Sequence, residues 1–381
     1  MNNLTDIRKE IDSIDEELTK LLVRRFEIVA DVAKAKHENG LPISDPSRER
    51  EILSRMTEKA GPEYENAIRM MFTTMFGLSK AHQRMLIGGQ SHLLDAIAQA
   101  QKNTPEFPSR ALVACPGIEG SYAQQATSMF FKLPSILFFN SFEKIFEAVE
   151  KGLCPYGILP IENSAAGSVA AVYDMMVRHH FYIVKALRLK VSHVLLGVKG
   201  SKLSDIREVS SHQHALAQCS NYLKGHPEFK LVPDTNTAVA AKNLATSGRL
   251  DKAVIASRDC AELYGLDILA EDIADAAFNY TRFICISKNL EIRPDARKIS
   301  IMLSLQHQPG MLNSIISRFA AIELNLTKLE SRPIPGMDFE FRFTFDFEAS
   351  LADEKALRLL AELETDPSIE HFTFLGAYAE N

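Results

Sequence analysis

Apolar residues recur at helical spacing through the first ninety residues, and no strand pattern occurs there. Along residues 4–36 they follow a 4-3-4-3 spacing and are Ile7, Ile11, Ile14, Leu18 and Leu21. This spacing predicts one long helix with a coiled-coil-like apolar seam, ended by Gly40 and Pro42. A second helix begins at Asp45-Pro46, because proline suits the first turn of a helix, and a third covers about residues 63–86. The N-terminal stretch is therefore predicted to be all-α.

Residues 110–290 alternate short apolar runs with helical patterns, which is typical of an α/β domain. The predicted strands cover residues 110–115, 156–160, 182–191, 194–198, 208–211, 253–256 and 283–287. The predicted helices cover residues 123–131, 142–151, 215–224 and 237–246. Several polar motifs follow strands directly, which is where open α/β sheets bind ligands.

The last stretch, residues 297–381, predicts the order βαββαβ of a ferredoxin-like α+β domain. Its strands are expected at residues 298–305, 326–330, 339–347 and 369–375, and its helices at 311–322 and 351–364. The chain is thus predicted to hold three domains, at residues 1–92, 110–290 and 297–381, with a linker over 93–109.

Composition and charge argue against nucleic-acid-binding and membrane-spanning proteins. The chain has 381 residues, of which 46% are hydrophobic and 24% charged, as in ordinary globular proteins. Its net charge of -6 argues against a general nucleic-acid binder. No apolar run is long enough for a membrane span, and the N-terminus has no secretory signal. The five scattered cysteines contain no CxxC pair and indicate reduced thiols, so we expect a cytoplasmic protein without nucleic-acid or membrane partners.

Charged residues on the first helix could bind an anionic ligand, or could simply form a solvated helix face. Arg25 and Lys36 lie about 16 Å apart along the helix axis and roughly 20° apart around it, so long side chains could reach one ligand. Arg8 lies about 26 Å from Arg25 on the same helix. Both arginines could therefore contact one small ligand only if Arg8 came from an antiparallel partner chain. Ser79 and Gln83 share one face of the third helix.

Five segments of residues 4–90 carry a recognisable pattern. They are Ile7-Arg8-Lys9-Glu10-Ile11-Asp12, Leu21-Leu22-Val23-Arg24-Arg25, Val32-Ala33-Lys34-Ala35-Lys36, Asp45 with Arg48-Glu49-Arg50, and Ser79 with Gln83. In these segments the stretch closely resembles the all-helical class of chorismate mutase. The resemblance implies a Claisen rearrangement of chorismate to prephenate, which needs no nucleophile, acid, metal or cofactor.

That resemblance also implies roles for eight side chains. Arg8, from the partner, and Arg25 would hold the two carboxylates, for which bidentate guanidinium groups are suited. Lys36 and Gln83 would donate to the ether oxygen. The ring hydroxyl and the rest of the pocket would be served by Asp45, Arg48, Glu49 and Ser79.

The middle stretch contains polar clusters but no obvious catalytic base. They are Gly117-Ile118-Glu119-Gly120-Ser121-Tyr122, Pro160-Ile161-Glu162-Asn163-Ser164, Ser211-His212-Gln213-His214 with Gln218-Cys219, Thr235-Asn236-Thr237-Ala238, and Asn279-Tyr280-Thr281-Arg282-Phe283. Taken alone, each of these glycine-rich or polar segments could simply form a turn or make structural hydrogen bonds. His212 and His214 resemble a metal pair, but no third ligand stands out, so no metal is predicted.

Together these clusters resemble the prephenate dehydratase family, above all in Thr281-Arg282-Phe283. The resemblance implies a two-lobed fold like type II periplasmic binding proteins and conversion of prephenate to phenylpyruvate. Thr281 would assist departure of the ring hydroxyl, and Asn163, Ser211 and Gln218 would orient the substrate. The predicted substrate-binding residues are Ser121, Glu162, Ser164, Thr237, Arg282 and Phe283.

The last stretch resembles the ACT-type regulatory domain of the same dehydratases. Gln308-Pro309-Gly310-Met311-Leu312 and Leu329-Glu330-Ser331-Arg332-Pro333 carry the likeness, and either segment alone could be a simple turn. The resemblance implies a phenylalanine site between paired domains, formed by Gly310, Met311, Leu312, Glu330, Ser331, Arg332 and Pro333.

The three resemblances predict a cofactor-independent, homodimeric or larger enzyme that acts on chorismate and prephenate with phenylalanine as effector. One alternative is a mutase joined to an arogenate dehydratase, and another is a sensing protein that binds ligand without turnover. A fused prephenate dehydrogenase is disfavoured, because no GxGxxG motif occurs.

Overall fold

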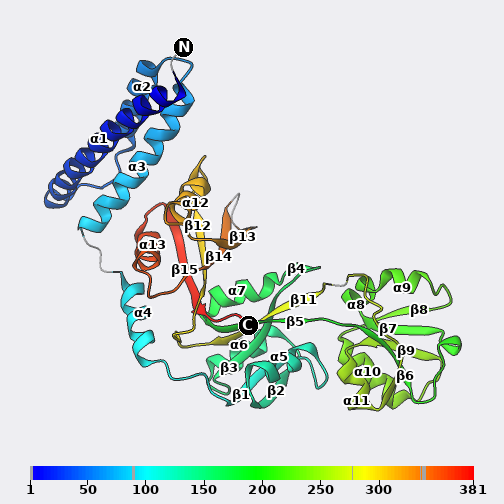
Figure 1. The fold of residues 1–381 in the computed structure, drawn as a ribbon. Coiled ribbons are helices and arrows are strands. Elements are labelled where there is room, and N and C mark those ends of the chain that lie inside the picture. The colour runs from blue at the N-terminus through cyan, green and yellow to red at the C-terminus, as the bar shows by residue number, and fades with distance from the viewer. Residues whose placement is uncertain (1–2, 88–90, 277, 335, 337–339) are drawn as a thin grey trace. The chain divides into compact units, whose positions relative to one another are not determined.

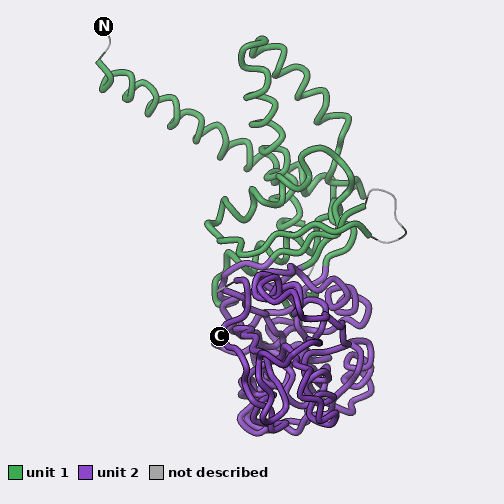
Figure 2. The backbone as a smooth tube through the Cα atoms, turned by 90° about the vertical axis from the view of Figure 1, so that its right-hand side faces the viewer, with its two compact units in different colours: residues 1–95, 302–345, 352–372 green, residues 96–301, 346–351, 373–381 purple. Residues whose placement is uncertain are grey.

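The computed structural model describes residues 3–87, 91–276, 278–334, 336 and 340–381. It consists of two compact units (Figure 2). Unit 1 comprises residues 1–95, 302–345 and 352–372, and unit 2 comprises residues 96–301, 346–351 and 373–381. This division runs through the predicted C-terminal domain, so the domain boundaries stay a prediction.

The N-terminal region is all-α, as predicted (Figure 1). Its helices are α1 (Leu4–Glu38), α2 (Pro46–Ala60) and α3 (Glu65–Ile87), and α3 packs against both others. Asp45 caps α2 by accepting a hydrogen bond from the Arg48 amide at 3.0 Å. The predicted linker begins with a further helix, α4 (His92–Asn103), which the sequence analysis did not anticipate.

Unit 2 contains two sheets, and the first has the strand order β2-β1-β3-β11-β5. These strands are β1 (Arg110–Pro116), β2 (Leu133–Phe139), β3 (Tyr156–Asn163), β5 (Tyr182–Lys190) and β11 (Tyr280–Ser287), with the short β4 (Gly167–Ser168) paired to β3. Strand β11 runs antiparallel to both of its neighbours. Helix α5 (Tyr122–Phe130) packs on one face with Ile158. Helix α6 (Phe142–Glu150) packs on the other face, where a Cβ on Gly157 would come within 2.8 Å of Ile145; α7 (Ala170–His179) also contacts β3.

The second sheet has the order β10-β6-β9-β7-β8. Its strands are β6 (Val194–Val198), β7 (Glu208–His212), β8 (Lys230–Asp234), β9 (Lys252–Ala256) and β10 (Leu266–Ala270), and a short 3-10 turn covers Leu203–Asp205. Val254 packs with α10 (Thr237–Ser247) and α11 (Arg258–Tyr264), whereas Ile255 packs with α8 (Gln213–Gln218) and α9 (Ser220–Lys224). Neighbouring strand residues thus bury opposite faces of the sheet. The chain crosses between the two sheets after β5 and again before β11.

The C-terminal elements follow the predicted βαββαβ order. They are β12 (Lys298–Leu305), α12 (Met311–Ala321), β13 (Leu326–Pro333), β14 (Phe341–Glu348), α13 (Glu354–Thr365) and β15 (Ile369–Tyr378), with the sheet order β13-β14-β12-β15. Phe339, where the third of these strands was expected to begin, lies outside the described residues.

Within unit 2 the last residues of the chain pair with β5. The Ala186 amide donates to the Ala379 carbonyl at 2.9 Å, and the Asn381 amide donates to the Ala186 carbonyl at 3.1 Å. Just before this tail, a Cβ on Gly376 would lie 2.3 Å from the Ile183 carbonyl oxygen. Only glycine permits so close an approach of the two backbones.

Some elements differ from the prediction. The predicted helix over residues 215–224 is two short helices, α8 and α9, that meet at Cys219. Strands β2, β4, β8 and β10 and helices α7 and α11 were not predicted. Of these, β2 and β8 lie at sheet edges and contain a proline, Pro134 and Pro233, which weakens a strand signal. All five cysteines are buried and free, and no helix among the described residues is long and apolar enough to cross a membrane.

Two candidate active sites

The first candidate site centres on Arg25 of α1, which points at α3. Its Nη1 donates to Ser79 Oγ at 2.5 Å, and Ser79 Oγ donates to the Met75 carbonyl at 2.7 Å. The Arg25 guanidinium carbon lies 6.0 Å from the centre of the Phe76 ring. Burial lowers the pKa of Arg25, but a guanidinium remains charged in proteins. A partly desolvated cation of this kind suits a carboxylate ligand.

Gln83 lies one helical turn beyond Ser79, and both side chains are buried. Gln83 Nε2 donates weakly to the Ser79 carbonyl at 3.3 Å, while its Oε1 is buried without a hydrogen-bond partner in the described residues. Lys36 Nζ donates to the Ile43 carbonyl at 2.7 Å. The structure therefore brings Arg25, Ser79 and Gln83 together, with Lys36 held by the loop after α1.

Charged residues of α2 make contacts that the sequence analysis did not foresee. Glu49 forms an ion pair with Lys80 of α3 at 3.0 Å, and Lys80 was not among the predicted site residues. Arg48 pairs with Glu51 at 2.7 Å on an exposed surface. Lys80 follows the predicted site residue Ser79 directly in the sequence, and this position is the one feature from which Lys80 could have been predicted.

Arg8 does not join this cluster within one chain. It is exposed near the start of α1, about 26 Å from Arg25 by helical rise. The apolar seam around it is exposed as well, with Ile11 at 51% and Ile14 at 52%. A stripe of large apolar side chains at this exposure is typical of a surface that packs against a partner.

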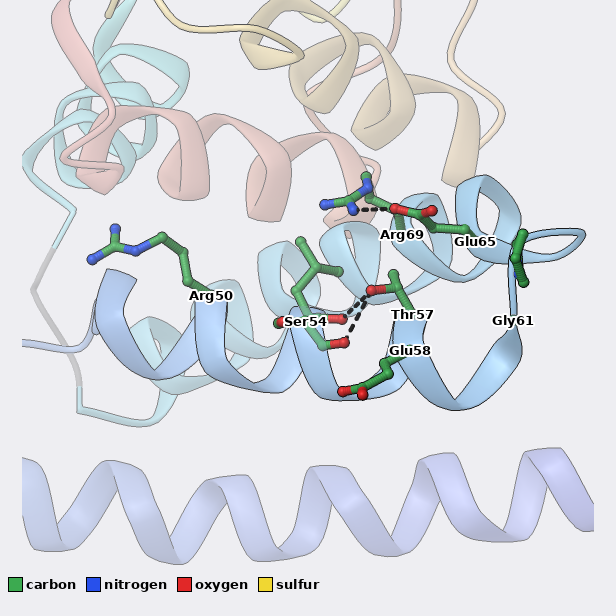
Figure 3. A pocket seen from close by; sticks show the side chains of 9 residues that line it. Arg50, Ser54, Thr57, Glu58, Gly61, Glu65 and Arg69 are labelled. Atoms are coloured by element: carbon green, nitrogen blue, oxygen red, sulfur yellow. Dashed lines mark hydrogen bonds and ion pairs between the residues drawn. The ribbon is translucent and has the colours of Figure 1, made fainter.

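A separate groove of about 610 Å³ lies between α2 and the start of α3 (Figure 3). Thr57 lies along it and donates to the Leu53 and Ser54 carbonyls, and Arg69 pairs with Glu65 at 2.7 Å. None of the predicted mutase residues lines this groove. It is therefore distinct from the Arg25 cluster.

The second candidate site centres on Thr281, where β11 begins beside the end of β3. Asn163 is the register partner of Thr281, and its Nδ2 donates to Thr281 Oγ1 at 2.9 Å. The same Nδ2 lies 2.8 Å from Asn279 Oδ1. Asn163 Oδ1 accepts hydrogen bonds from the Ala165 and Ala166 amides at 3.0 and 2.9 Å. Backbone amides can only donate, so they fix which end of the Asn163 side chain faces Thr281.

The hydrogen bonds continue from Asn279 to the other sheet. Asn279 Nδ2 donates to Gln218 Oε1 at 3.1 Å, and His193 Nε2 lies 3.0 Å from the same oxygen. His193 Nδ1 lies 3.2 Å from the Tyr122 hydroxyl, which also donates to the Ser192 carbonyl at 2.5 Å. His193 and Asn279 are both buried, at 2% exposure each. They lie on the two segments that cross between the sheets.

The donors and acceptors of these hydrogen bonds follow from the orientations of the Asn163 and Asn279 side-chain amides. Because Asn163 Nδ2 faces Thr281, Oγ1 of Thr281 accepts a hydrogen bond and its own proton has no acceptor among the described residues. Because Gln218 Oε1 accepts from Asn279, His193 must carry its proton on Nε2. Burial lowers the pKa of His193, although the bond to Gln218 opposes that shift, so the ring is neutral near pH 7. Thr281 is thus presented as a free hydroxyl donor.

The structure places the remaining predicted dehydratase residues as follows. Ser211 Oγ donates to the Ile255 carbonyl at 2.6 Å and is fully buried, and Ser164 Oγ accepts from the Tyr280 amide at 2.9 Å. Ser121 caps α5, and Thr237 is the first residue of α10. Phe283 is buried in the core beneath the first sheet rather than facing an open site.

A cavity of about 660 Å³ lies beside the two caps. It is lined by residues that follow β1, β2 and β8, among them Gly117, Asn140 and Asn236. Asn236 caps α10 by accepting from the Ala238 amide at 2.8 Å. The cavity therefore adjoins the start of α10, where backbone amides favour anions.

Arg282 has partners other than a ligand. Its guanidinium pairs with Asp346 at 2.6 Å and Glu380 at 2.7 Å, donates to the Tyr378 hydroxyl at 2.6 Å, and lies 3.9 Å from Glu162. It is 6% exposed. Arg282 is thus held by contacts inside the protein, and its carboxylate-binding role stays a prediction.

The two predicted effector segments lie at a turn and on an edge strand. Gly310 has a φ of 83° and precedes α12, which Met311 and Leu312 begin. Glu330 and Arg332 lie on β13 with Ser331 and Pro333, and Arg332 donates to Glu330 at 2.7 Å. Strand β13 is an edge strand of its sheet in the part of the chain that the structure describes.

Among the described residues no group of three or more His, Cys, Asp or Glu side chains could hold a metal ion. His212 and His214 stack at 5.3 Å between ring centres, and His212 Nδ1 accepts from the His214 amide. Their proximity is therefore explained by the start of α8.

Comparison with known proteins covers both sites. A model of the prephenate dehydratase family matches residues 113–291, and a model of type II chorismate mutase matches residues 7–84. A bifunctional chorismate mutase/prephenate dehydratase of Escherichia coli K12 is 30% identical over 99% of this chain and 96% of its own length. An arogenate dehydratase/prephenate dehydratase of Arabidopsis thaliana is 40% identical over 71% of this chain and 73% of its own. The structure of a prephenate dehydratase from Arthrobacter aurescens in complex with L-Phe aligns with a TM-score of 0.64 and 30% identity, over 70% of this chain and 89% of that chain.

Proposed function

The chain belongs to the bifunctional chorismate mutase/prephenate dehydratase family, and from this premise we propose that it catalyses two consecutive reactions of phenylalanine biosynthesis. The N-terminal helices rearrange chorismate to prephenate. The two-sheet region then converts prephenate to phenylpyruvate. One observation carries this proposal. Asn163 donates a hydrogen bond to the hydroxyl of Thr281, which leaves the proton of that hydroxyl available for a substrate.

The mutase step needs binding and electrostatics rather than a nucleophile. Chorismate is a dianion whose reacting ends must be folded together while negative charge grows on the ether oxygen. Arg25 supplies a fixed cation for one carboxylate, held by Ser79. Gln83 and Lys36 supply donors for the ether oxygen.

The site is completed by a second copy of the chain. The exposed seam of α1 pairs with the seam of an antiparallel partner helix, which brings Arg8 of the partner subunit to the second carboxylate. We therefore propose that the protein is at least a homodimer. The exposure of Ile11 and Ile14 supports this, because such side chains are stabilised by burial at about 25 cal/mol per Å².

The dehydratase step removes the ring carboxylate and the ring hydroxyl together. The carboxylate leaves as CO₂, its bonding electrons enter the ring, and the C–O bond breaks as the oxygen takes up a proton and leaves as water. Thr281 donates a hydrogen bond to that oxygen, which stabilises its developing charge. Gln218 and Asn163 hold the geometry, and the amides at the starts of α5 and α10, near Ser121 and Thr237, receive the substrate carboxylates.

A second candidate substrate is arogenate, the amino analogue of prephenate. The 40% identity to an arogenate dehydratase/prephenate dehydratase favours this candidate. The same bond changes apply to both substrates. The ratio of kcat/KM for the two compounds decides between them.

We also propose that the βαββαβ region is an ACT-type sensor for phenylalanine. The relative solved with L-Phe supports this proposal, as does the edge position of β13, the strand of Glu330 and Arg332. Paired domains would bind the effector between Gly310 to Leu312 of one copy and residues 330–333 of the other. The two-lobed, periplasmic-binding-protein-like fold and the cytoplasmic location remain parts of the same proposal.

One coupled assay tests the function. Chorismate is given to the purified full-length protein, and prephenate and phenylpyruvate are followed with and without phenylalanine. We expect phenylpyruvate to appear without any added cofactor and phenylalanine to suppress it. Tight ligand binding with no turnover of chorismate, prephenate or arogenate would instead establish a sensing protein.

A further inference from the structure

Arg282 follows the proposed catalytic Thr281 directly, yet the two side chains lie on opposite faces of β11. Thr281 faces Asn163, whereas Arg282 faces its register partner Glu162. Successive residues of a strand point to opposite sides. A substrate held by Thr281 is therefore on the far side of the strand from the Arg282 guanidinium.

All three nitrogens of that guanidinium have partners near the end of the chain. Nη1 contacts Asp346 at 2.6 Å, Nη2 contacts the Tyr378 hydroxyl at 2.6 Å, and Nε contacts Glu380 at 2.7 Å. Ser300 bridges two of these groups, since its Oγ lies 2.6 Å from Asp346 and 2.5 Å from the Tyr378 hydroxyl. The partners come from β14, β15 and the tail, which are far from β11 in sequence, and from β12, which is the next strand along the chain.

The charges in this cluster are balanced and buried. The side chains of Arg282 and Asp346 are 6% and 2% exposed, and that of Glu380 is 13% exposed. Lys298 forms a second ion pair with Glu380. Removal of one partner would leave a buried charge unpaired, so the cluster resists partial opening.

The tail that carries Glu380 is itself part of the first sheet. Ala379 and Asn381 bond to Ala186 of β5, the strand that pairs with β11. The start of β11 is thus held from two directions, by the guanidinium cluster and by a sheet extended with the tail. No other described arginine of the two-sheet region is as buried as Arg282.

We propose that Arg282 is a positioning residue, which anchors the start of β11 to Asp346, Tyr378 and Glu380 and thereby fixes the placement of Thr281. This inference rests on the proposed dehydratase function. It makes the C-terminal residues a structural requirement for the dehydratase step and not for the mutase step. A displacement of about 1 Å at a reacting group can cost on the order of a hundredfold in rate.

The test uses Tyr378→Phe in the full chain, which removes one hydroxyl and keeps the ring in its buried site. We expect kcat with prephenate to fall about tenfold and KM to stay within twofold, because the anchor does not touch substrate. Hydrogen exchange of residues 280–287 and 376–381 should rise together. Arg282→Lys keeps the charge but cannot reach three acceptors, so it should shift the same quantities in the same direction.

Arg249→Gln is the matched control. Arg249 forms an exposed ion pair with Asp251 at 2.9 Å beside the second sheet and is not among the residues that contact Arg282 or its partners. We expect this variant to change neither exchange nor prephenate turnover, and the mutase rate should hold in all three variants.

Two results would overturn the proposal. A raised KM with unchanged kcat would mean that Arg282 acts on substrate, and unchanged kcat with faster exchange would leave the cluster merely structural. If the unmodified protein fails to convert prephenate, the proposed function fails. The exchange of residues 280–287 and 376–381 then still decides whether the anchor exists.

Discussion

Replacement of Asn163 by aspartate puts a hydrogen-bond acceptor in place of the donor that faces Thr281 in the proposed dehydratase site. In the native protein Asn163 Nδ2 donates to Thr281 Oγ1 at 2.9 Å. The substituted carboxylate has the same shape and can only accept. The Ala165 and Ala166 amides still bind one oxygen, so the other must face Thr281. The Thr281 proton then turns toward the carboxylate and is no longer available to the leaving hydroxyl.

The magnitude follows from the loss of one aligned donor. Removal of such a donor in other enzymes costs roughly 10²–10³ in kcat, or about 2.7–4 kcal/mol. The carboxylate also approaches the Asn279 oxygen, now 2.8 Å from Nδ2, which adds repulsion. We therefore expect kcat with prephenate to fall at least a hundredfold in Asn163→Asp.

The assay is a double-mutant cycle on prephenate turnover, with the mutase rate as the internal control for folding. Thr281→Val removes the hydroxyl at nearly constant shape. If Asn163 acts through Thr281, the double variant is no slower than Thr281→Val alone. Additive losses, or an Asn163→Asp variant that keeps most of its kcat, would refute the reasoning.

Three further predictions concern other parts of the chain. Ser79→Ala should raise KM for chorismate about tenfold, because Arg25 loses its 2.5 Å acceptor, and leave prephenate turnover unchanged; an unaltered KM contradicts this. Gly376→Ala should lower Tm by about 5–10 °C, since its Cβ would lie 2.3 Å from the Ile183 oxygen. Gly77→Ala in α3, which has open space around it and no left-handed φ, should not lower Tm. Burial raises the pKa of Glu380, but Arg282 and Lys298 outweigh this and lower it below its usual range. The ion pairs of Glu380 therefore stabilise the fold at pH values above the ordinary carboxyl pKa, and this stabilisation is lost as pH falls through the lowered pKa. The urea midpoint of Glu380→Gln should therefore change less with pH in the acid range than that of the native chain.

Sequence periodicity predicted most elements because apolar burial generates it. The buried face of α13 with Leu359 and Leu363, and the buried run of β6, are clear in the sequence. The edge strands β2 and β8 were missed because each contains a proline and is only partly buried. Helix α4 was missed because the prolines after it, Pro105 and Pro108, made the whole stretch look like a linker.

The candidate sites were predictable where the residues lie on one element or one motif. Ser79 and Gln83 share a helix face, and their placement followed from spacing alone. His193 was missed because it lies on a crossing between the sheets, and its partner Gln218 is brought to it only by the tertiary fold. Asn279 stood in a recognised motif, but its bond to Gln218 could not be read from neighbouring residues.

Thr281 and Arg282 are neighbours in one motif but lie on opposite faces of β11. A strand that presents Thr281 to one face must present Arg282 to the other, so no ligand on the Thr281 face can reach both side chains directly. Alternation alone therefore excluded a shared role once residues 280–287 were placed in a strand. What alternation could not supply was the identity of the partners, because Asp346 and Glu380 lie 64 and 98 positions further along the chain. Under the two proposals, the motif joins a residue that acts on substrate to a residue that holds the strand in place.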